Sequence, residues 1–205
     1  MGLSSGSLTY TRLITVGDLP ENHAEAWCEA LEQHAFHEIE VAGDLEQSWG
    51  WVQSDDPFES SWHPHTLLRP GDGLLLCLRI DTLKIPATTL KAWAKRHEKE
   101  RMAAMGRERL SRAERDQLKD EVKRRLRRQS LPKMQLIEAA WNLTNGELRL
   151  MSTSKALVGR FVDVFEKTFH LQLRSLDPLT LLWARELGDE QMDAVARLDS
   201  EPFHI

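Results

Sequence analysis

The chain has 205 residues, 41% of them hydrophobic, which allows one large or two small domains with a sizeable core and excludes a disordered protein. Its net charge of −5 by itself argues against a nucleic-acid-binding protein, but the charge is unevenly distributed. Residues 88–134 contain 16 Lys and Arg against 7 Asp and Glu, whereas the rest of the chain contains 11 against 25. This asymmetry can orient a polyanion towards one face while the acidic remainder repels it.

The two cysteines and the N-terminus indicate a cytoplasmic protein. Cys28 and Cys77 lie in apolar patterns outside any CxxC pair, so we expect buried, reduced thiols. No apolar run approaches the roughly 18 residues of a membrane span. The N-terminus has neither a hydrophobic signal region nor a myristoylation pattern.

The first part of the chain predicts strands around one helix. Residues 1–7 are expected to be flexible, residues 8–16 to form a strand, and Pro20 to open a helix. The expected buried face of that helix is Ala24, Trp27, Cys28, Leu31 and Ala35. Residues 49–52 predict a brief strand with both tryptophans on one face, and residues 55–72 predict a loop. The almost wholly apolar residues 74–80 predict a central strand.

The basic segment, residues 88–134, predicts two helices. The first runs to about Met105, where Gly106 breaks it, and its expected buried residues are Leu90, Trp93, Ala94 and Met102. Ser111 and Glu114 form the pattern of a capping box at the start of the second. This helix has an apolar residue at every fourth position, and the resulting seam is Leu118, Val122 and Leu126. The helix should end before Pro132.

The last part of the chain predicts a hairpin, a helix and a strand. Asn145-Gly146 is a strong hairpin signal, and Ser154 is expected to cap a helix. That helix would bury Leu157, Phe161, Val164, Phe165 and Phe169. A strand over 171–176 precedes a helical tail over 177–205. The expected fold is an α+β domain over residues 8–176, in which antiparallel sheets have helices packed on one side, with the basic segment as a helical insertion.

No motif specifies an enzyme. The chain has no P-loop, GxGxxG, GxSxG or HExxH, so we predict no catalytic residue, no cofactor and no metal site. His63 and His65 resemble a chelating pair, but a plain surface turn explains them better. A metal-dependent nuclease would need these histidines to converge with Asp55 and Asp56.

The cations of the second basic helix are the main candidate site. Lys119, Lys123 and Arg127 fall on a stripe beside the apolar seam. A solvated helix face is the ordinary explanation of such a run, and binding of a polyanion is the alternative. Arg125 is discounted because Glu121 lies one turn before it. The candidate DNA-contacting residues are Lys119, Lys123, Arg124, Arg127 and Arg128, with Arg112, Lys91 and Lys95 as a second group. Trp62 is a candidate exposed stacker.

Several segments together resemble one known family. Three segments, followed by Leu131-Pro132 and the Asn145-Gly146 hairpin, resemble the recombination-associated RdgC proteins in content and order. The three segments are Leu74-Leu-Leu-Cys-Leu-Arg-Ile80, Leu83-Lys-Ile-Pro-Ala-Thr-Thr-Leu90 and Leu118-Lys-Asp-Glu-Val122. Trp49-Gly50-Trp51-Val52 is similar to that family's Gly-Trp-Val strand. The resemblance covers about residues 8–176.

The resemblance implies a cytoplasmic, nucleoid-associated DNA-binding protein without catalytic activity. RdgC proteins form a ring-shaped dimer around duplex DNA and restrain a recombinase, so the resemblance implies a homo-oligomer and a protein partner in recombination. Two departures stand out: the segment between Pro132 and Asn145 lacks the family's aromatic dimer contact, and the chain ends soon after Leu176. A ring could therefore not close in the same way.

Two functions follow as hypotheses. The first is sequence-independent binding of duplex DNA through its backbone, in the manner of RdgC proteins and without catalysis. The alternative is a protein-interaction module whose basic helix docks an acidic partner protein.

Overall fold

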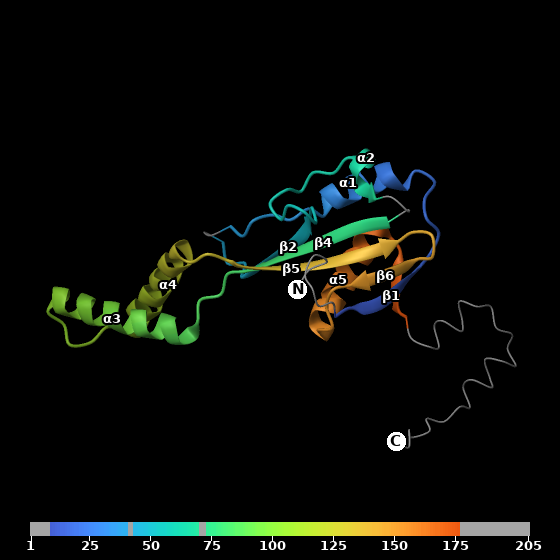
Figure 1. The fold of residues 1–205 in the computed structure, drawn as a ribbon. Helices are drawn as coiled ribbons and strands as arrows, with labels where there is room; N and C mark the ends of the chain where they lie inside the picture. The colour runs from blue at the N-terminus through green and yellow to red at the C-terminus, as the bar shows by residue number, and fades with distance from the viewer. Residues whose placement is uncertain (1–8, 41–42, 70–72, 177–205) are drawn as a thin grey trace, which may run out of the picture. The chain divides into compact units, whose positions relative to one another are not determined.

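A computed structural model of the chain describes residues 9–40, 43–69 and 73–176. The fold is α+β, as predicted, with an antiparallel sheet as its centre (Figure 1). The strand order is β2-β4-β5-β6-β1-β7, and the short β3 pairs with β4. Contacts divide the chain into two compact units, and strands β4 (Gly73–Thr82) and β5 (Lys133–Asn142) each contribute to both.

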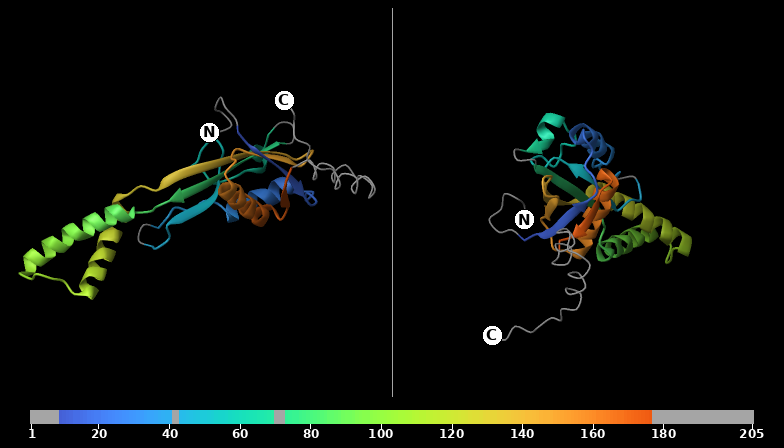
Figure 2. Two further views of the ribbon diagram at one scale, coloured as in Figure 1. Left: turned by 90° about the horizontal axis from the view of Figure 1, so that it is seen from below. Right: turned by 90° about the vertical axis from the view of Figure 1, so that its right-hand side faces the viewer.

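Unit 1 comprises Met1–Gln33, Ser61–Cys77 and Ile137–Ile205. Its strands include β1 (Thr11–Val16), β6 (Glu147–Leu150) and β7 (Gln172–Ser175), and β1 pairs with both of the others. Helices α1 (His23–Gln33) and α5 (Lys155–Phe169) contact each other on the same side of these strands, as the left view of Figure 2 shows. The expected packing of helices on one side is therefore found in this unit.

An aromatic cluster forms the core of unit 1. Trp141 of β5 lies 4.9 Å from Trp27 of α1 and 5.1 Å from Phe165 of α5, measured between ring centroids. Phe169 contacts all three rings. Because each such pair adds roughly 0.5–1.5 kcal/mol beyond area burial, the cluster fixes both helices on the sheet. Side chains alternate along β6, so Leu148 is buried here while Arg149 lies on the opposite, open face.

Unit 2 comprises His34–Ser60 and Leu78–Leu136. It contains β2 (Gln47–Val52) and the helices α3 (Ala87–Met105) and α4 (Arg112–Gln129). Its core holds a buried ion pair, in which the Arg79 guanidinium donates to both carboxylate oxygens of Asp81 at 3.0 and 2.7 Å. The same guanidinium donates to the Pro57 carbonyl and lies 4.1 Å from the centre of the Phe36 ring.

Most element boundaries were predicted correctly from local sequence patterns. The two basic helices, the break at Gly106, the hairpin at Gly146 and the final strand all lie where predicted. Cys28 and Cys77 are buried free thiols, as predicted, and burial raises the pKa of Cys77 to about 12. The predicted tail over 177–205 lies outside the described residues.

Other expectations were wrong in detail. Helix α1 begins at His23 rather than at Pro20, so Ala35 lies beyond its end. The segment expected to be a loop contains helix α2 (Pro64–Leu67) and strand β3 (Leu68–Arg69). Ser154 occupies the N-cap position of α5 without a side-chain capping bond. The two tryptophans of β2 differ in environment, because Trp51 is fully buried whereas Trp49 is 45% exposed.

Candidate nucleic-acid interface

Helix α4 begins with the predicted capping box. The Glu114 amide donates to the Ser111 hydroxyl at 3.2 Å, and the Ser111 amide donates to the Glu114 carboxylate at 2.8 Å. These bonds satisfy two backbone donors that the first helical turn leaves unpaired. They also hold the pKa of Glu114 below its usual value, the bond from the Ser111 backbone being the largest cause.

Helices α3 and α4 contact each other within unit 2 (Figure 1). Leu118 and Val122 of the predicted seam are buried, and Leu126 is half-buried. The face of α3 was expected to be buried as well, but no side chain of this helix is. Leu90, Trp93, Ala94 and Met102 are all half-buried. The reason lies in composition, because charged and small residues predominate in α3 and leave too narrow a stripe of large apolar side chains for complete burial.

The first cluster of cations, here called the lysine groove, combines residues from both helices. Its hollow has a volume of about 550 Å³, and its apolar floor is Ala87, Leu90 and Ala94. Lys91 and Lys95 from α3 and Lys119 from α4 line it, together with Glu98. Three of the predicted cations, separated by up to 28 positions in sequence, are thus brought together.

The second cluster, here called the arginine hollow, lies on another face of α4. Arg124, Arg125 and Arg128 line a hollow of about 350 Å³ together with Glu121 and Gln129. The Glu121 carboxylate lies 3.4 Å from the Arg101 guanidinium of α3. Arg125 was discounted on the expectation that Glu121 would pair with it, and this reason was wrong because Glu121 pairs with Arg101 instead. Arg125 therefore belongs with the candidate cations.

The remaining predicted cations are in different environments. Arg127 is buried, with 3% of its surface exposed, and its guanidinium donates to the Leu45 carbonyl at 2.8 Å. This burial is at odds with the expectation that Arg127 faces a phosphate. Lys123 is half-buried, and its ammonium lies 3.6 Å from the Glu46 carboxylate. Arg112 is exposed in the first turn of α4.

The other candidates do not assemble into a metal site. Within residues 9–40, 43–69 and 73–176, no group of three or more His, Cys, Asp and Glu side chains could hold a metal ion. His63 is the N-cap residue of α2, His65 is the second residue of this helix, and both are exposed. Trp62, the candidate stacker, is half-buried. No helix in the described part of the chain is both long and apolar enough to span a membrane.

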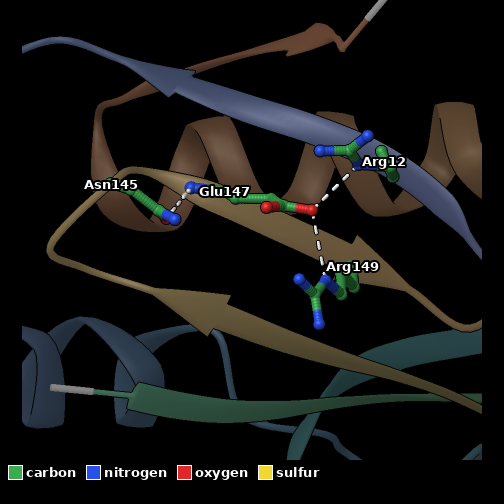
Figure 3. A network of polar contacts seen from close by, with 4 residues as sticks. All are labelled: Arg12, Asn145, Glu147 and Arg149. Carbon is green, nitrogen blue, oxygen red and sulfur yellow. Dashed lines mark hydrogen bonds and ion pairs between the residues drawn. The ribbon is translucent and has the colours of Figure 1, made fainter. Parts of the chain in front are cut away.

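Sequence reasoning missed a further polar cluster, which lies in unit 1. The Glu147 carboxylate accepts hydrogen bonds from Arg12 at 2.9 Å and from Arg149 at 3.1 Å (Figure 3). Arg12 and Arg149 are directly paired across β1 and β6, and Glu147 lies two residues before Arg149 on the same face. The Asn145-Gly146 hairpin signal could have located this cluster, but only with the register of β1 against β6.

Comparison with known proteins adds to this geometry. A search of curated proteins finds no significant match to the chain. The family model described as "Putative exonuclease, RdgC" matches residues 15–183, a range that includes both basic helices and the hairpin. Because this match covers well over half of the chain, the protein belongs to the RdgC family.

Proposed function

We propose that this member of the RdgC family binds duplex DNA through the phosphate backbone, without reading base sequence and without catalysis, and that it acts in recombination. The observation that carries the proposal is the arginine hollow. Three exposed arginines from two successive turns of α4 line one hollow, and its one carboxylate, Glu121, is already paired with Arg101. Guanidinium groups suit phosphates because each guanidinium can donate two parallel hydrogen bonds to the oxygens of a phosphate.

One duplex is not expected to contact both cation clusters of α4 equally. At about 100° per residue, Arg124 lies roughly 140° and Arg128 roughly 180° around the helix from Lys119. The two clusters therefore occupy different sides of α4. We assign the direct phosphate contacts to Arg124, Arg125 and Arg128, and a longer-range electrostatic contribution to Lys91, Lys95 and Lys119.

The test compares two triple variants that change the charge equally. One carries Arg124→Glu, Arg125→Glu and Arg128→Glu; the other, the matched control, carries Lys91→Glu, Lys95→Glu and Lys119→Glu. Affinity for a labelled random duplex would be measured by fluorescence anisotropy over a series of salt concentrations. We expect the arginine variant to reduce the slope of log affinity against log salt by about 3, since each neutralised phosphate contributes roughly 0.9.

Three results would contradict the proposal. The wild-type protein could fail to bind the duplex even at low salt. The two triple variants could lose affinity equally, which would indicate a general charge effect rather than contacts at the arginine hollow. Degradation of end-labelled DNA in the presence of Mg²⁺ or Mn²⁺ would contradict the absence of catalysis and would fit the exonuclease in the family's description.

The lysine groove favours a second candidate function, which is docking of an acidic partner protein. Its apolar floor of Ala87, Leu90 and Ala94 suits leucine-like side chains, and the surrounding lysines suit carboxylates. A synthetic peptide rich in Leu, Asp and Glu would serve as the probe. Under this hypothesis the lysine variant loses peptide binding while the arginine variant retains it.

A further inference from the structure

We propose that Arg12 and Arg149, on the open face of the unit 1 sheet, form a binding site for a phosphate group. This site is separate from α3 and α4, and its existence does not depend on the function proposed above. The ligand is a phosphate, supplied either by a free phosphate compound or by a nucleic-acid backbone.

The strand register places two like charges directly opposite each other. Arg12 of β1 pairs with Arg149 of β6, and like charges in this arrangement repel. Glu147 compensates one of the two charges, so the cluster of three side chains keeps a formal charge of +1. A bound anion would remove the remaining repulsion, which is the physical reason for placing the site here.

Glu147 holds both arginines in an orientation suited to a second anion. Each arginine donates to Glu147 Oε1 through its Nε atom, at 2.9 and 3.1 Å (Figure 3). Arg12 and Arg149 retain 46% and 55% side-chain exposure, whereas Glu147 is only 13% exposed. The use of Nε leaves the terminal Nη groups as the donors that can reach a phosphate. Because Glu147 restricts both side chains beforehand, less conformational entropy is lost when the ligand binds.

A hollow beside Arg149 provides space for the ligand. Its volume is about 180 Å³, and its lining is Gly73, Ala140, Trp141, Asn142, Asn145, Glu147 and Arg149. Ala140 is the direct partner of Arg149 on β5, and this small side chain leaves the space above the sheet open. A side chain added at Gly73 would meet no atom nearer than the Trp141 carbonyl at 4.0 Å, so this part of the hollow is open as well.

The two asparagines of the hairpin add donors to the hollow. The Asn142 amide oxygen accepts hydrogen bonds from the backbone N–H groups of Thr144 and Asn145. The Asn145 amide oxygen accepts from the Glu147 N–H. With both oxygens engaged, each asparagine presents its NH₂ group as the polar end still able to donate. The hollow therefore combines amide and guanidinium donors, which suit a phosphate, with the Glu147 carboxylate, whose Oε1 already accepts from both arginines.

The test follows the arginine Nε–H and asparagine NH₂ signals of the full chain by NMR. The two probes are inorganic phosphate and a short single-stranded oligonucleotide, each compared with sodium chloride at the same ionic strength. We expect saturable shifts of the Arg12, Arg149, Asn142 and Asn145 side-chain signals with at least one probe. Response to phosphate indicates a site for free phosphate compounds, and response to the oligonucleotide alone indicates a site for a nucleic-acid backbone.

Arg149→Gln should weaken this binding about tenfold or more, because a hydrogen bond from a charged group is worth roughly 1.5–3 kcal/mol. The matched control is Arg174→Gln, which alters an arginine on the same open face that bonds to Gln172. The proposal is overturned if neither probe gives saturable shifts in the wild-type protein, or if the control weakens binding equally. The arginine variant of α4 should leave the shifts unchanged, so this test and the duplex-binding test can fail separately.

Discussion

The Arg127 guanidinium donates a hydrogen bond to the Leu45 carbonyl, with 2.8 Å between Nη2 and the oxygen. Both residues belong to unit 2, although they are 82 positions apart. The bond shows that the run of cations from Lys123 to Arg128 does not form one uniform surface. Arg127 is buried, while its neighbour Arg128 is exposed and lines the arginine hollow.

Arg127→Ala should destabilise the protein, whereas Arg128→Ala should not. The first change removes a charge-assisted hydrogen bond and leaves the Leu45 carbonyl without that donor, at a cost of about 1–3 kcal/mol. The second changes an exposed side chain, with an expected effect within about 0.5 kcal/mol. Urea unfolding of both variants measures the difference, and equal stability of the two would contradict the structural role of Arg127.

Arg125→Glu should weaken duplex binding as much as Arg124→Glu does. The reason is that Glu121 pairs with Arg101 at 3.4 Å, which leaves Arg125 to interact with DNA. Anisotropy with the labelled duplex measures both variants. Arg115→Glu, a change of the same charge at an exposed position of α4 outside the hollow, is the control. If Arg125→Glu had no more effect than this control, Glu121 would have to neutralise Arg125 in solution.

Gly50→Ala should destabilise unit 2. Strand β2 approaches the chain after α1 so closely that the Trp51 N–H donates to the His34 carbonyl at 3.0 Å and the Phe36 N–H donates to the Trp51 carbonyl at 2.9 Å. A Cβ atom at Gly50 would collide with the backbone of Ala35 and Phe36. Because backbone must move, we expect a loss of about 3 kcal/mol in thermal or urea unfolding.

Gly159→Ala is the matched control for this change. Gly159 lies within α5, and an added Cβ would meet no atom within 4 Å. Alanine is the better helix former by roughly 0.5–1 kcal/mol, so the control should stabilise the protein. A stabilising effect of Gly50→Ala would show that the close approach of β2 to Ala35 is absent in solution.

The stabilising effect of Glu147 should depend on pH. Hydrogen bonds from Arg149 and then Arg12 hold the pKa of Glu147 below its usual value. A carboxylate with a lowered folded-state pKa stabilises the protein above its unfolded pKa, about 4.3, and this contribution is lost as the pH falls through the folded value. Wild-type protein should therefore exceed Glu147→Gln in urea midpoint at neutral pH, with the difference shrinking towards about pH 3. A difference that stays constant with pH would contradict this role of the ionised carboxylate.

The sequence by itself determined the features that depend on neighbouring residues. The capping box of Ser111 and Glu114 and the hairpin at Gly146 involve residues at most a few positions apart, so their signals are complete within a short segment. The buried side of α1 followed from its periodicity, since Trp27, Cys28 and Leu31 are all buried. The α+β class and the resemblance to RdgC proteins followed from the order of such segments.

Only the tertiary structure decided which cations are accessible and how they are grouped. Helical periodicity places Arg127 beside Lys123, but the burial of Arg127 depends on Leu45, which the periodicity of α4 does not include. Likewise, Glu121 had a suitable partner in Arg125 one turn away, yet the packing of α3 brought Arg101 to it. The pairing of Arg12 with Arg149 required the register of two strands that are more than 130 positions apart. Each of these contacts joins distant segments, and their geometry is fixed by packing and strand pairing rather than by local conformational preference.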